Sequence, residues 1–508
     1  MCSIAGVYWF NKANSPKDDG LYKMTEQALS VLVNRGPDES SLATVSENCV
    51  LAGNRLAIRG GINRGSMPFR HNGNVLFYNG EIYNYKKWNS KAVSDGEVLL
   101  PLYEDKKHNA FVELDGEFAI SLWDNKEGAL YLVRDFFGTK PLYFSLNKDR
   151  LLWASSASAI NAMEKHSFCS AVKGPTYKHA LDVQEPYTSF NGVWLVPPGH
   201  FLKVDKGGAK LFCYNLWPEY GGNTIDTKEC FEALSESLKT RVDFDGVVGI
   251  PMSGGIDSGI IAFMADKLKI RYQIFSLVEI FGKKTEETDV ILDRVSRLKN
   301  CEKVTLIKFG EEEYRKALSE IFLKDYYDSE RFGGGDLLMH AVFDAMHKEK
   351  IRVAIDGSGG DELFHGYKFH DDFKSVHGWP KNWKNTNYFY SLYTTLLDYT
   401  SKSDRAGAHF SIEARYPYQN VKLMHASLKL KFSDVLKWPL RKFLLENVDY
   451  GIPTDIDRYG KYGFSVKNKD INEVISDMQL AWCKSNGLTT LSRKSPLKFP
   501  FRMGNKLI

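Results

Sequence analysis

The sequence is poor in cysteine, and the cysteines that it has are not arranged for structural bonds. The seven cysteines among the 508 residues are an odd number, lie far apart and include no CxxC pair. This scatter argues against a disulfide framework and against a zinc site. It suits a reducing compartment, so we expect a cytoplasmic protein.

Long apolar runs and long runs of one charge are missing as well. No stretch has the length and apolar character of a membrane span, and the N-terminus lacks a basic segment followed by an apolar one. The net charge is only +4, from interspersed basic and acidic residues, so we expect neither a nucleic acid nor a membrane as partner. The composition, 43% hydrophobic and 26% charged, is that of a globular protein. The length of 508 residues suggests two to four domains.

Residues 1–206 have the pattern of an antiparallel β protein. Short apolar runs are separated by glycine, asparagine and aspartate, which predicts strands of packed antiparallel sheets. Helical spacing over 23–33 ends before the turn at Arg35-Gly36-Pro37-Asp38. The clearest strand candidates are 74–78, 117–123 and 128–133.

After residue 226 the pattern changes to alternating helices and strands. The loose stretch 207–226 contains Pro218, Gly221 and Gly222 and is predicted to be a linker. Beyond it, the alternation predicts an α/β domain over 227–508, with a parallel sheet, crossover helices and a mostly helical C-terminal part. The candidate elements are a helix over 228–238, a strand over 247–250, a helix from about Ser258 and strands over 273–278 and 351–355.

Cys2 is a candidate nucleophile. If Met1 is removed, the thiol and the α-amino group lie on one residue, and the amine, with a free pKa of about 8, can act as the base for the thiol. Such a pair needs neither histidine nor aspartate. Taken alone, a Met-Cys start is an ordinary early cysteine, so this assignment depends on the motifs that follow.

A glycine-rich turn joins the strand at 247–250 to the next helix. Its glycines let the backbone approach a ligand, its serines add hydroxyl donors, and the helix N-terminus favours an anion. Asp257 would repel a bare phosphate, so we expect it to hold Mg²⁺ that bridges to the phosphate. The GK[ST] ending of a Walker loop is missing, and a plain tight turn is the alternative. The turn reads Pro251-Met252-Ser253-Gly254-Gly255-Ile256-Asp257-Ser258.

A second glycine-rich turn follows the strand at 351–355. It begins Asp356-Gly357-Ser358-Gly359-Gly360-Asp361 and lies at the carboxyl end of a predicted parallel strand, where doubly wound sheets bind ligands. Asp361 is a second carboxylate suited to Mg²⁺. Two such turns in one sheet predict a triphosphate site.

With these motifs in order, the whole chain resembles the asparagine synthetase family. In that family a class II glutamine amidotransferase, an antiparallel α+β sandwich of the Ntn-hydrolase type, precedes a PP-loop ATP-dependent synthetase. The resemblance implies that Cys2 is the glutaminase nucleophile and that the oxyanion hole includes Asn79 and Gly80. It also implies that glutamine is bound by Arg55 at its carboxylate, by Asp95 at its amino group, and by Asn79 and Glu81.

On the synthetase side the resemblance implies an ATP site and a catalytic lysine. The matching lysine is Lys461, which would stabilise negative charge while the adenylate and the amide form. Asp257 and Asp361 would hold Mg²⁺. The positions that match ATP contacts are Met252, Ser253, Gly254, Gly255, Asp257, Ser258, Leu277, Asp356 and Gly357.

The sequence departs from asparagine synthetases at the positions that match the acceptor pocket. Ser358 stands where the family has a glutamate, and a hydroxyl cannot replace a carboxylate as a base at neutral pH. Gly333-Gly334-Gly335 replace small polar residues of the aspartate-binding run, and suggest room for a larger acceptor or a mobile loop. Asn420 stands where the family often has aspartate.

These observations leave several functions open. The first is a carbon–nitrogen ligase that hydrolyses glutamine, channels ammonia, adenylates a carboxylate with release of AMP and pyrophosphate, and forms an amide. Its acceptor would be aspartate or, given the departures, another carboxylate such as a sugar acid or a natural-product intermediate. The second is a ring-closing synthetase like the β-lactam and lasso-peptide enzymes, which generally lack the nucleophilic cysteine. The third is a regulatory or scaffold relative. A homodimer is the assembly that the resemblance suggests.

Overall fold

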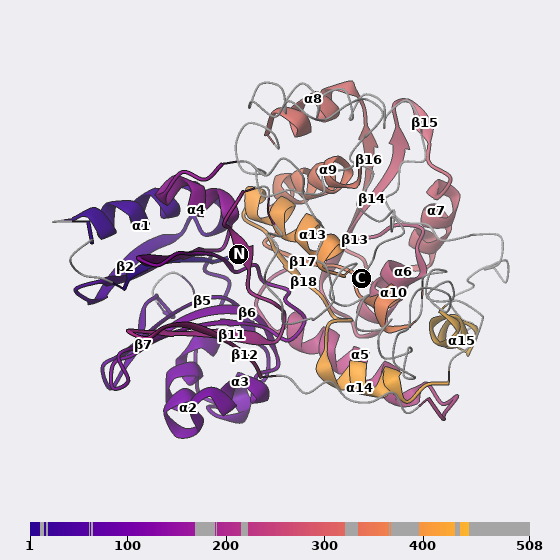
Figure 1. Ribbon diagram of the computed structural model, residues 1–508. Helices are drawn as coiled ribbons and strands as arrows, with labels where there is room; N and C mark the ends of the chain where they lie inside the picture. Colours follow the sequence, from indigo (N-terminus) through magenta and orange to yellow (C-terminus); the bar gives the residue numbers. More distant parts are fainter. Residues whose placement is uncertain are drawn as a thin grey trace, which may run out of the picture. The chain divides into compact units, whose positions relative to one another are not determined.

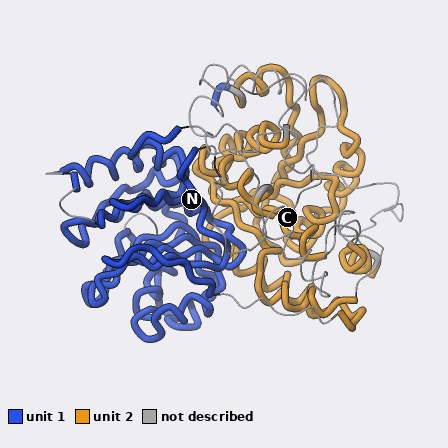
Figure 2. Tube along the Cα trace, in the orientation of Figure 1, with its two compact units in different colours: residues 1–216, 318–334, 466–508 blue, residues 217–317, 335–465 orange. Residues whose placement is uncertain are grey.

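The computed structural model describes two compact units, which are considered separately (Figures 1 and 2). The first unit contains residues 1–216, and the second consists of residues 217–317 and 335–465. The described residues are 1–10, 15–16, 19–59, 61, 64–167, 188, 190–214, 222–320, 334–364, 366, 396–431 and 437–446.

The first unit contains two six-stranded antiparallel sheets. One has the order β10 (Trp194–Leu195), β8 (Tyr143–Leu146), β9 (Arg150–Ala154), β1 (Ser3–Trp9), β3 (Cys49–Arg55) and β2 (Glu39–Ser46). The other has the order β12 (Gly208–Cys213), β11 (His200–Asp205), β7 (Ala129–Arg134), β6 (Gly116–Asp124), β5 (Asn74–Ile82) and β4 (Phe69–His71). The predicted antiparallel sheets are therefore confirmed.

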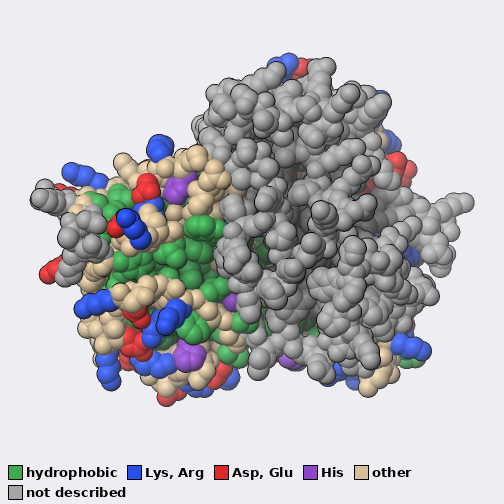
Figure 3. All heavy atoms as spheres, viewed as in Figure 1, with side chains coloured by type: hydrophobic (Ala, Val, Ile, Leu, Met, Phe, Trp, Pro, Cys, Tyr) green, Lys and Arg blue, Asp and Glu red, His purple; other side chains and the backbone are tan. Residues whose placement is uncertain are grey.

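The two sheets pack face to face, with helices on their outer faces. Along β1, Ile4 and Tyr8 face the other sheet, whereas Ala5 and Val7 contact the helices, as the two-residue period of a strand requires. The helices α1 (Gly20–Val31) and α4 (Ala157–Met163) cover the first sheet, and α2 (Leu99–Lys106) and α3 (Ala110–Glu113) cover the second. Figure 3 shows a band of hydrophobic side chains along the boundary between the sheets.

The predicted linker 207–226 begins with a strand. Residues Gly208–Cys213 form β12, which pairs with β11 through a register that runs from Asp205–Gly208 to His200–Cys213. The chain reverses at 206–207, so the first part of the predicted linker is the second strand of a hairpin. Residues 215–221 lie outside the described part of the chain.

The second unit is built on a mainly parallel sheet. Its order is β15 (Lys283–Lys284), β14 (Tyr272–Ile280), β13 (Val248–Pro251), β17 (Val353–Ile355) and β18 (Glu413–Arg415), and β16 (Lys303–Phe309) pairs with β14. Only β15 pairs in the antiparallel direction among these described strands. The parallel sheet predicted after residue 226 is thus confirmed.

Helices surround this sheet (Figure 1). The predicted helices at 228–238 and from Ser258 correspond to α5 and α6, and the C-terminal helical part is described as far as α15. Among the described residues no helix has both the length and the apolar character needed to cross a bilayer. The helices are α5 (Lys228–Arg241), α6 (Ile256–Lys267), α7 (Thr288–Arg297), α8 (Glu311–Glu320), α9 (Gly334–Lys348), α10 (Gly360–Leu363), α13 (Leu396–Phe410), α14 (Val421–Leu428) and α15 (Trp438–Glu446).

Candidate active sites

Cys2 and Arg55 lie at adjacent ends of β1 and β3. The antiparallel register pairs Ser3 with Asn54, so the next pair along the ladder would join Cys2 to Arg55. The Cys2 thiol is half-buried and lies 3.9 Å from the carbonyl oxygen of Leu56. The backbone carbonyl of Cys2 accepts a hydrogen bond from Nε of Arg35 at 3.2 Å. Backbone pairing and this buried arginine together fix the position of the candidate nucleophile.

The Arg55 guanidinium is buried and faces the loop that follows β3. Its Nη2 donates to the carbonyl oxygen of Gly61 at 2.9 Å and also to that of Arg64. Nη1 lies 3.4 Å from the Glu39 carboxylate. The guanidinium is therefore held by backbone carbonyls and one carboxylate, and a buried arginine of this kind can bind a substrate carboxylate.

Asn79 and Gly80 lie within β5, on the second sheet. The Asn79 side chain is fully buried, and neither atom of its amide has a hydrogen-bond partner among the described residues. Gly80 has a φ of +139°, and a Cβ there would collide with the carbonyl oxygen of Glu117, so this position requires glycine. A buried amide donor without a partner is costly unless a ligand uses it.

Asp95 is buried beside the same strand. Its Oδ1 accepts from the Tyr78 hydroxyl at 2.8 Å, and its Oδ2 accepts from the Ile82 backbone N–H at 2.7 Å. Burial raises the pKa of this carboxyl, while the Ile82 hydrogen bond and the Arg59 charge oppose the shift. Arg59 also donates to Glu81 at 3.0 Å. Asp95 is therefore held against β5 at Tyr78 and Ile82, and Glu81 belongs to the same strand as Asn79.

The first glycine-rich turn lies between β13 and α6, as predicted. The Met252 N–H donates to the Phe275 carbonyl of β14 at 3.0 Å, and Leu277 is buried two residues farther along β14. Within the turn, the Ser253 N–H donates to Oγ of Ser258 at 3.2 Å, and the Gly255 N–H donates to Oγ of Ser253 at 3.1 Å. The two serine hydroxyls therefore shape the turn.

The second glycine-rich turn meets the first. A Cβ on Gly357 would lie 3.0 Å from the backbone nitrogen of Ser258, so the two turns approach at their backbones. Asp356 is buried; its Oδ1 accepts from the hydroxyl of Ser358 at 2.6 Å and its Oδ2 from that of Ser403 at 2.6 Å. The structure thus brings Asp356 and Gly357 to the loop that contains Asp257.

Lys437 lies between the two aspartates predicted to hold a metal. Its Nζ contacts Asp257 and lies 3.0 Å from Oδ1 of Asp361. Burial alone would lower the pKa of Lys437, but the two carboxylates raise it, so the ammonium stays charged. Burial and Asp361 raise the pKa of Asp257, whereas Lys437 lowers it. No sequence motif marks Lys437, which directly precedes α15 and lies 180 residues from Asp257 in the chain.

Asn420 and part of the glycine run, which belong to the predicted acceptor pocket, both have places at the starts of helices of the fold. The Asn420 side chain caps α14, accepting from the Leu423 N–H at 2.9 Å, which is the usual task of asparagine before a helix. Gly334 and Gly335 begin α9, which places part of the glycine run in a helix. Lys461 and Gly333 lie outside the described residues.

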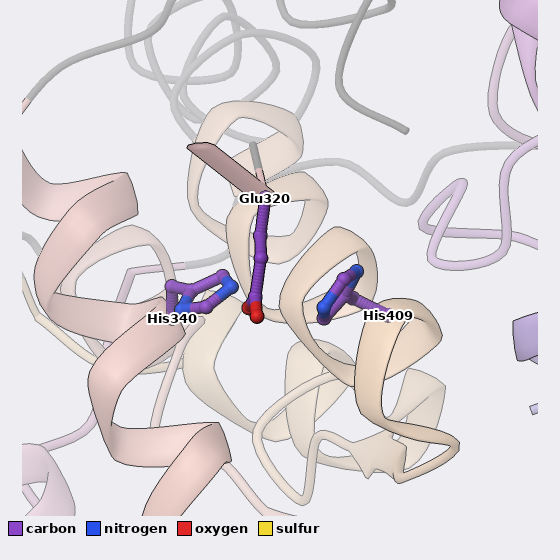
Figure 4. A group of neighbouring side chains, drawn as sticks. All are labelled: Glu320, His340 and His409. Atoms are coloured by element: carbon purple, nitrogen blue, oxygen red, sulfur yellow. The ribbon is translucent and has the colours of Figure 1, made fainter. Parts of the chain in front are cut away.

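A histidine pair lies elsewhere in the second unit. His340 on α9 and His409 on α13 have ring centroids 5.2 Å apart, and His340 is buried (Figure 4). Burial, reinforced by His409 and Lys316, lowers the pKa of His340 to about 3, while Asp344 opposes the shift. His340 is therefore neutral at physiological pH. Figure 4 also draws Glu320, the last residue of α8.

Comparison with known families also divides the chain into two parts. A family model described as a glutamine amidotransferase domain matches residues 1–216. A second, described as asparagine synthase, matches residues 229–393. The first match contains Cys2, Arg55, Asn79 and Asp95, and the second contains both glycine-rich turns.

Curated relatives carry corresponding names. Asparagine synthetase [glutamine-hydrolyzing] 1 of Bacillus subtilis is 28% identical over 73% of this chain, and the chain spans 59% of its length. Asparagine synthetase B of Escherichia coli is 26% identical over 85% of this chain, and the match covers 76% of the length of that relative. Amidase chry2 of Gibberella zeae is 27% identical over 75% of this chain, and the match covers 62% of the length of that relative.

Among solved structures, glutamine phosphoribosylpyrophosphate amidotransferase from B. subtilis is similar, with a sequence identity of 16% and a TM-score of 0.31. The similarity covers 54% of this chain and 65% of the chain of that protein. The two family models and the curated relatives agree with the motifs placed above. The chain belongs to the asparagine synthetase family, with a class II glutamine amidotransferase domain followed by a synthetase domain.

Proposed function

We propose that this protein is a glutamine-dependent amidotransferase that forms an amide on a carboxylate at the expense of ATP. Glutamine is hydrolysed at Cys2 and the ammonia passes to the synthetase domain. There ATP adenylates the acceptor carboxylate with loss of pyrophosphate, and ammonia replaces AMP. The observation that carries the proposal is the buried Asn79 amide, which has no hydrogen-bond partner among the described residues and lies on the strand that also holds Gly80 and Glu81.

The chemistry of the first site supports glutamine as the nitrogen donor. A thiolate that attacks an amide carbonyl needs a donor already in place for the oxyanion, and the Asn79 amide nitrogen can supply it. A free amino acid is held at both ends by one cation and one anion, and the buried Arg55 and Asp95 supply this pair. The α-amine of Cys2, once Met1 is removed, would take the thiol proton.

The residues of the second site fit a magnesium nucleotide. Asp257 and Asp361 would hold Mg²⁺, and Oδ1 of Asp257 is buried without a hydrogen-bond partner in the described part of the chain, as expected of an oxygen that is available to a hard cation. When bound, this ion would neutralise phosphate charge. Lys437 supplies a further positive charge at the two carboxylates. Ser253, Ser258 and the first turn of α6 offer donors to the phosphates.

We propose that the acceptor is a carboxylate other than aspartate. The Ser358 hydroxyl, at the position of the family's glutamate, is used to bind Asp356. Asn420, at the position of the family's aspartate, is used as a helix cap.

The experiment that tests the proposal follows nitrogen and phosphate together. The full chain is incubated with ATP, Mg²⁺, amide-¹⁵N glutamine and a panel of carboxylates, and the products are analysed by mass spectrometry. We expect ¹⁵N in a new amide, together with AMP and pyrophosphate. Cys2→Ala should abolish this labelling but spare synthesis from added ammonium, whereas Cys213→Ala, at an exposed position, should change neither. Loss of the ammonium reaction in Cys2→Ala would contradict the two-site mechanism.

A further inference from the structure

Two charged side chains hold the first glycine-rich turn from the side of α7. Glu287, which directly precedes α7, accepts a hydrogen bond from the Gly254 N–H through Oε2 at 2.7 Å. Arg294, within α7, donates through Nη1 to the carbonyl oxygens of Ser253 at 3.3 Å and Gly255 at 2.7 Å. Neither side chain was singled out in the sequence.

These contacts fix the orientation of consecutive peptide groups. In a planar trans peptide the carbonyl and the N–H point in opposite directions. The peptide between Ser253 and Gly254 is held at both ends, its carbonyl by Arg294 and its N–H by Glu287. Because Arg294 holds the Gly255 carbonyl, the N–H of Ile256 points away from Arg294. The N–H groups of this first helical turn have no intrahelical acceptor.

The electrostatic environment gives the two residues different properties. Burial lowers the pKa of Arg294 to about 10, although Glu287 and Asp257 oppose the shift, so the guanidinium stays charged at neutral pH. Burial raises the pKa of Glu287 to about 7, against the Gly254 hydrogen bond and the Arg294 charge, and Glu286 adds to the rise. The protonation state of Glu287 therefore changes within the physiological range.

We propose that Arg294 and Glu287 are positioning residues for the nucleotide: they hold the glycine-rich turn so that the N–H groups at the start of α6 are directed to the phosphates. This inference rests on the proposed function, since it requires that the turn binds ATP. Arg294 acts through two carbonyls, both bound by its Nη1, so the position of this one nitrogen matters. Glu287 needs only an acceptor oxygen for the Gly254 N–H, and its negative charge opposes a polyphosphate when it is ionised.

Calorimetric binding of Mg²⁺ with a non-hydrolysable ATP analogue to the full chain tests the role of Arg294. Arg294→Lys keeps the charge but loses the Nη1 donor that binds both carbonyls, and we expect about tenfold weaker binding. Arg297→Lys is the matched control: Arg297 lies on the same helix and pairs with Asp293 at the surface, so its variant should bind as the wild type does. Equal affinities for all three proteins, or equal losses in both variants, would overturn the positioning role.

Glu287 is tested by separating its hydrogen bond from its charge. Glu287→Ala removes the acceptor and should weaken analogue binding about tenfold, whereas Glu287→Gln keeps an acceptor and should restore it. Between pH 6 and 8, the wild-type dissociation constant should rise about threefold relative to that of Glu287→Gln, because the carboxylate ionises near pH 7 beside the phosphates.

The outcomes separate this inference from the function on which it rests. If the wild-type chain binds no magnesium nucleotide, the proposed function fails. If the wild type binds but Glu287→Ala binds equally well, or if the Gln variant has the same pH profile as the wild type, only the positioning role fails. Glutamine hydrolysis, measured in each variant, shows that the chain is folded.

Discussion

The Lys437 ammonium lies 3.0 Å from Oδ1 of Asp361, although α13 and α14 come between the two residues in the described part of the chain. The same ammonium contacts Asp257, so one lysine joins the two glycine-rich turns. A single positive charge between two carboxylates leaves a net negative charge, and this is the arrangement that a divalent cation would complete.

Replacing Lys437 should destabilise the second unit. Lys437→Met leaves two largely buried carboxylates facing each other, and loss of one partner from such a network costs about 3 kcal/mol of the free energy of unfolding. Millimolar Mg²⁺ should recover part of this loss, because the ion binds only the folded site. Thermal unfolding with and without Mg²⁺ measures both effects. Lys442→Met, on the exposed face of α15, is the control; similar melting of the two variants would contradict the arrangement.

The two aspartates should be needed for ATP chemistry only. Asp257→Asn and Asp361→Asn keep the shape of each side chain but remove the charge, and each should abolish most pyrophosphate release from ATP. Glutamine hydrolysis should persist, because its residues lie in the first unit. Pyrophosphate release and glutamate formation are measured side by side, with Asp293→Asn at the surface of α7 as control. Normal adenylation by either variant would exclude that aspartate as a metal ligand.

Asn79 should matter for activity and hardly for stability. Its amide has no hydrogen-bond partner among the described residues, so Asn79→Ala removes no native contact of that group, but it should lower kcat for glutamine hydrolysis about 10²- to 10³-fold. Asn54 is the matched control, because its amide donates to the Leu29 carbonyl at 2.9 Å and accepts from Ser40 at 2.7 Å.

Asn54→Ala should therefore lower the free energy of unfolding by about 1–3 kcal/mol. Steady-state kinetics and denaturant unfolding of both variants provide the comparison. An Asn79→Ala protein that is destabilised as much as Asn54→Ala would show that Asn79 has a structural role.

Features encoded within one strand, turn and helix were predictable from sequence. The turn from Met252 to Ser258 was placed correctly, since the motif and its supporting elements are contiguous in the chain. The strand predicted over 74–78 is the first part of β5, which continues to Ile82 and so includes Asn79. The strand β12 was missed because residues 208–213 fell within the predicted linker.

Contacts between distant segments could not be predicted in this way. Lys437 reaches Asp257 across 180 residues, and no local signal marks it. Glu287 before α7 and Arg294 in its last turn look like ordinary charges of an amphipathic helix, although both bind the glycine-rich turn. Asn420 could be compared with a family position, but its use as the cap of α14 depends on the local backbone. Side chains that bridge elements far apart in the sequence can therefore be identified only from the folded structure.

Stability of the second unit should fall in mild acid because of His340. Its pKa is about 3 in the folded chain and about 6.5 when unfolded, so the folded state binds fewer protons. The stabilisation is complete above pH 6.5 and is lost as pH falls from 6.5 towards 3, by up to about 1.4 kcal/mol per pH unit. His340→Phe should flatten the slope of unfolding free energy between pH 7 and 5. His108→Gln, at an exposed site, should keep the wild-type slope; an equal slope in all three proteins would contradict this.

The last prediction concerns the acceptor. A pocket for L-aspartate must pair an amino group and two carboxylates, because unpaired charge in a dry site is costly. The hydroxyl of Ser358 is bound to Asp356. Asp336, an alternative carboxylate, pairs with Arg405 at 3.0 Å. We therefore expect L-aspartate to have a kcat/KM at least about tenfold below that of the best carboxylate in a panel, a difference of about 1.4 kcal/mol in transition-state stabilisation.

Pyrophosphate exchange and glutamine-dependent amide formation, measured on the same panel, test this expectation. AMP and pyrophosphate should form with the preferred carboxylate, because the turn at Ser253–Ser258 would bind the leaving pyrophosphate whatever the acceptor is. Ser358→Glu should raise the relative rate with aspartate, since it returns a carboxylate to the family's position, whereas Ser358→Gln, of similar size without the charge, should not. Efficient conversion of aspartate to asparagine by the wild-type chain would refute the prediction and make aspartate the acceptor.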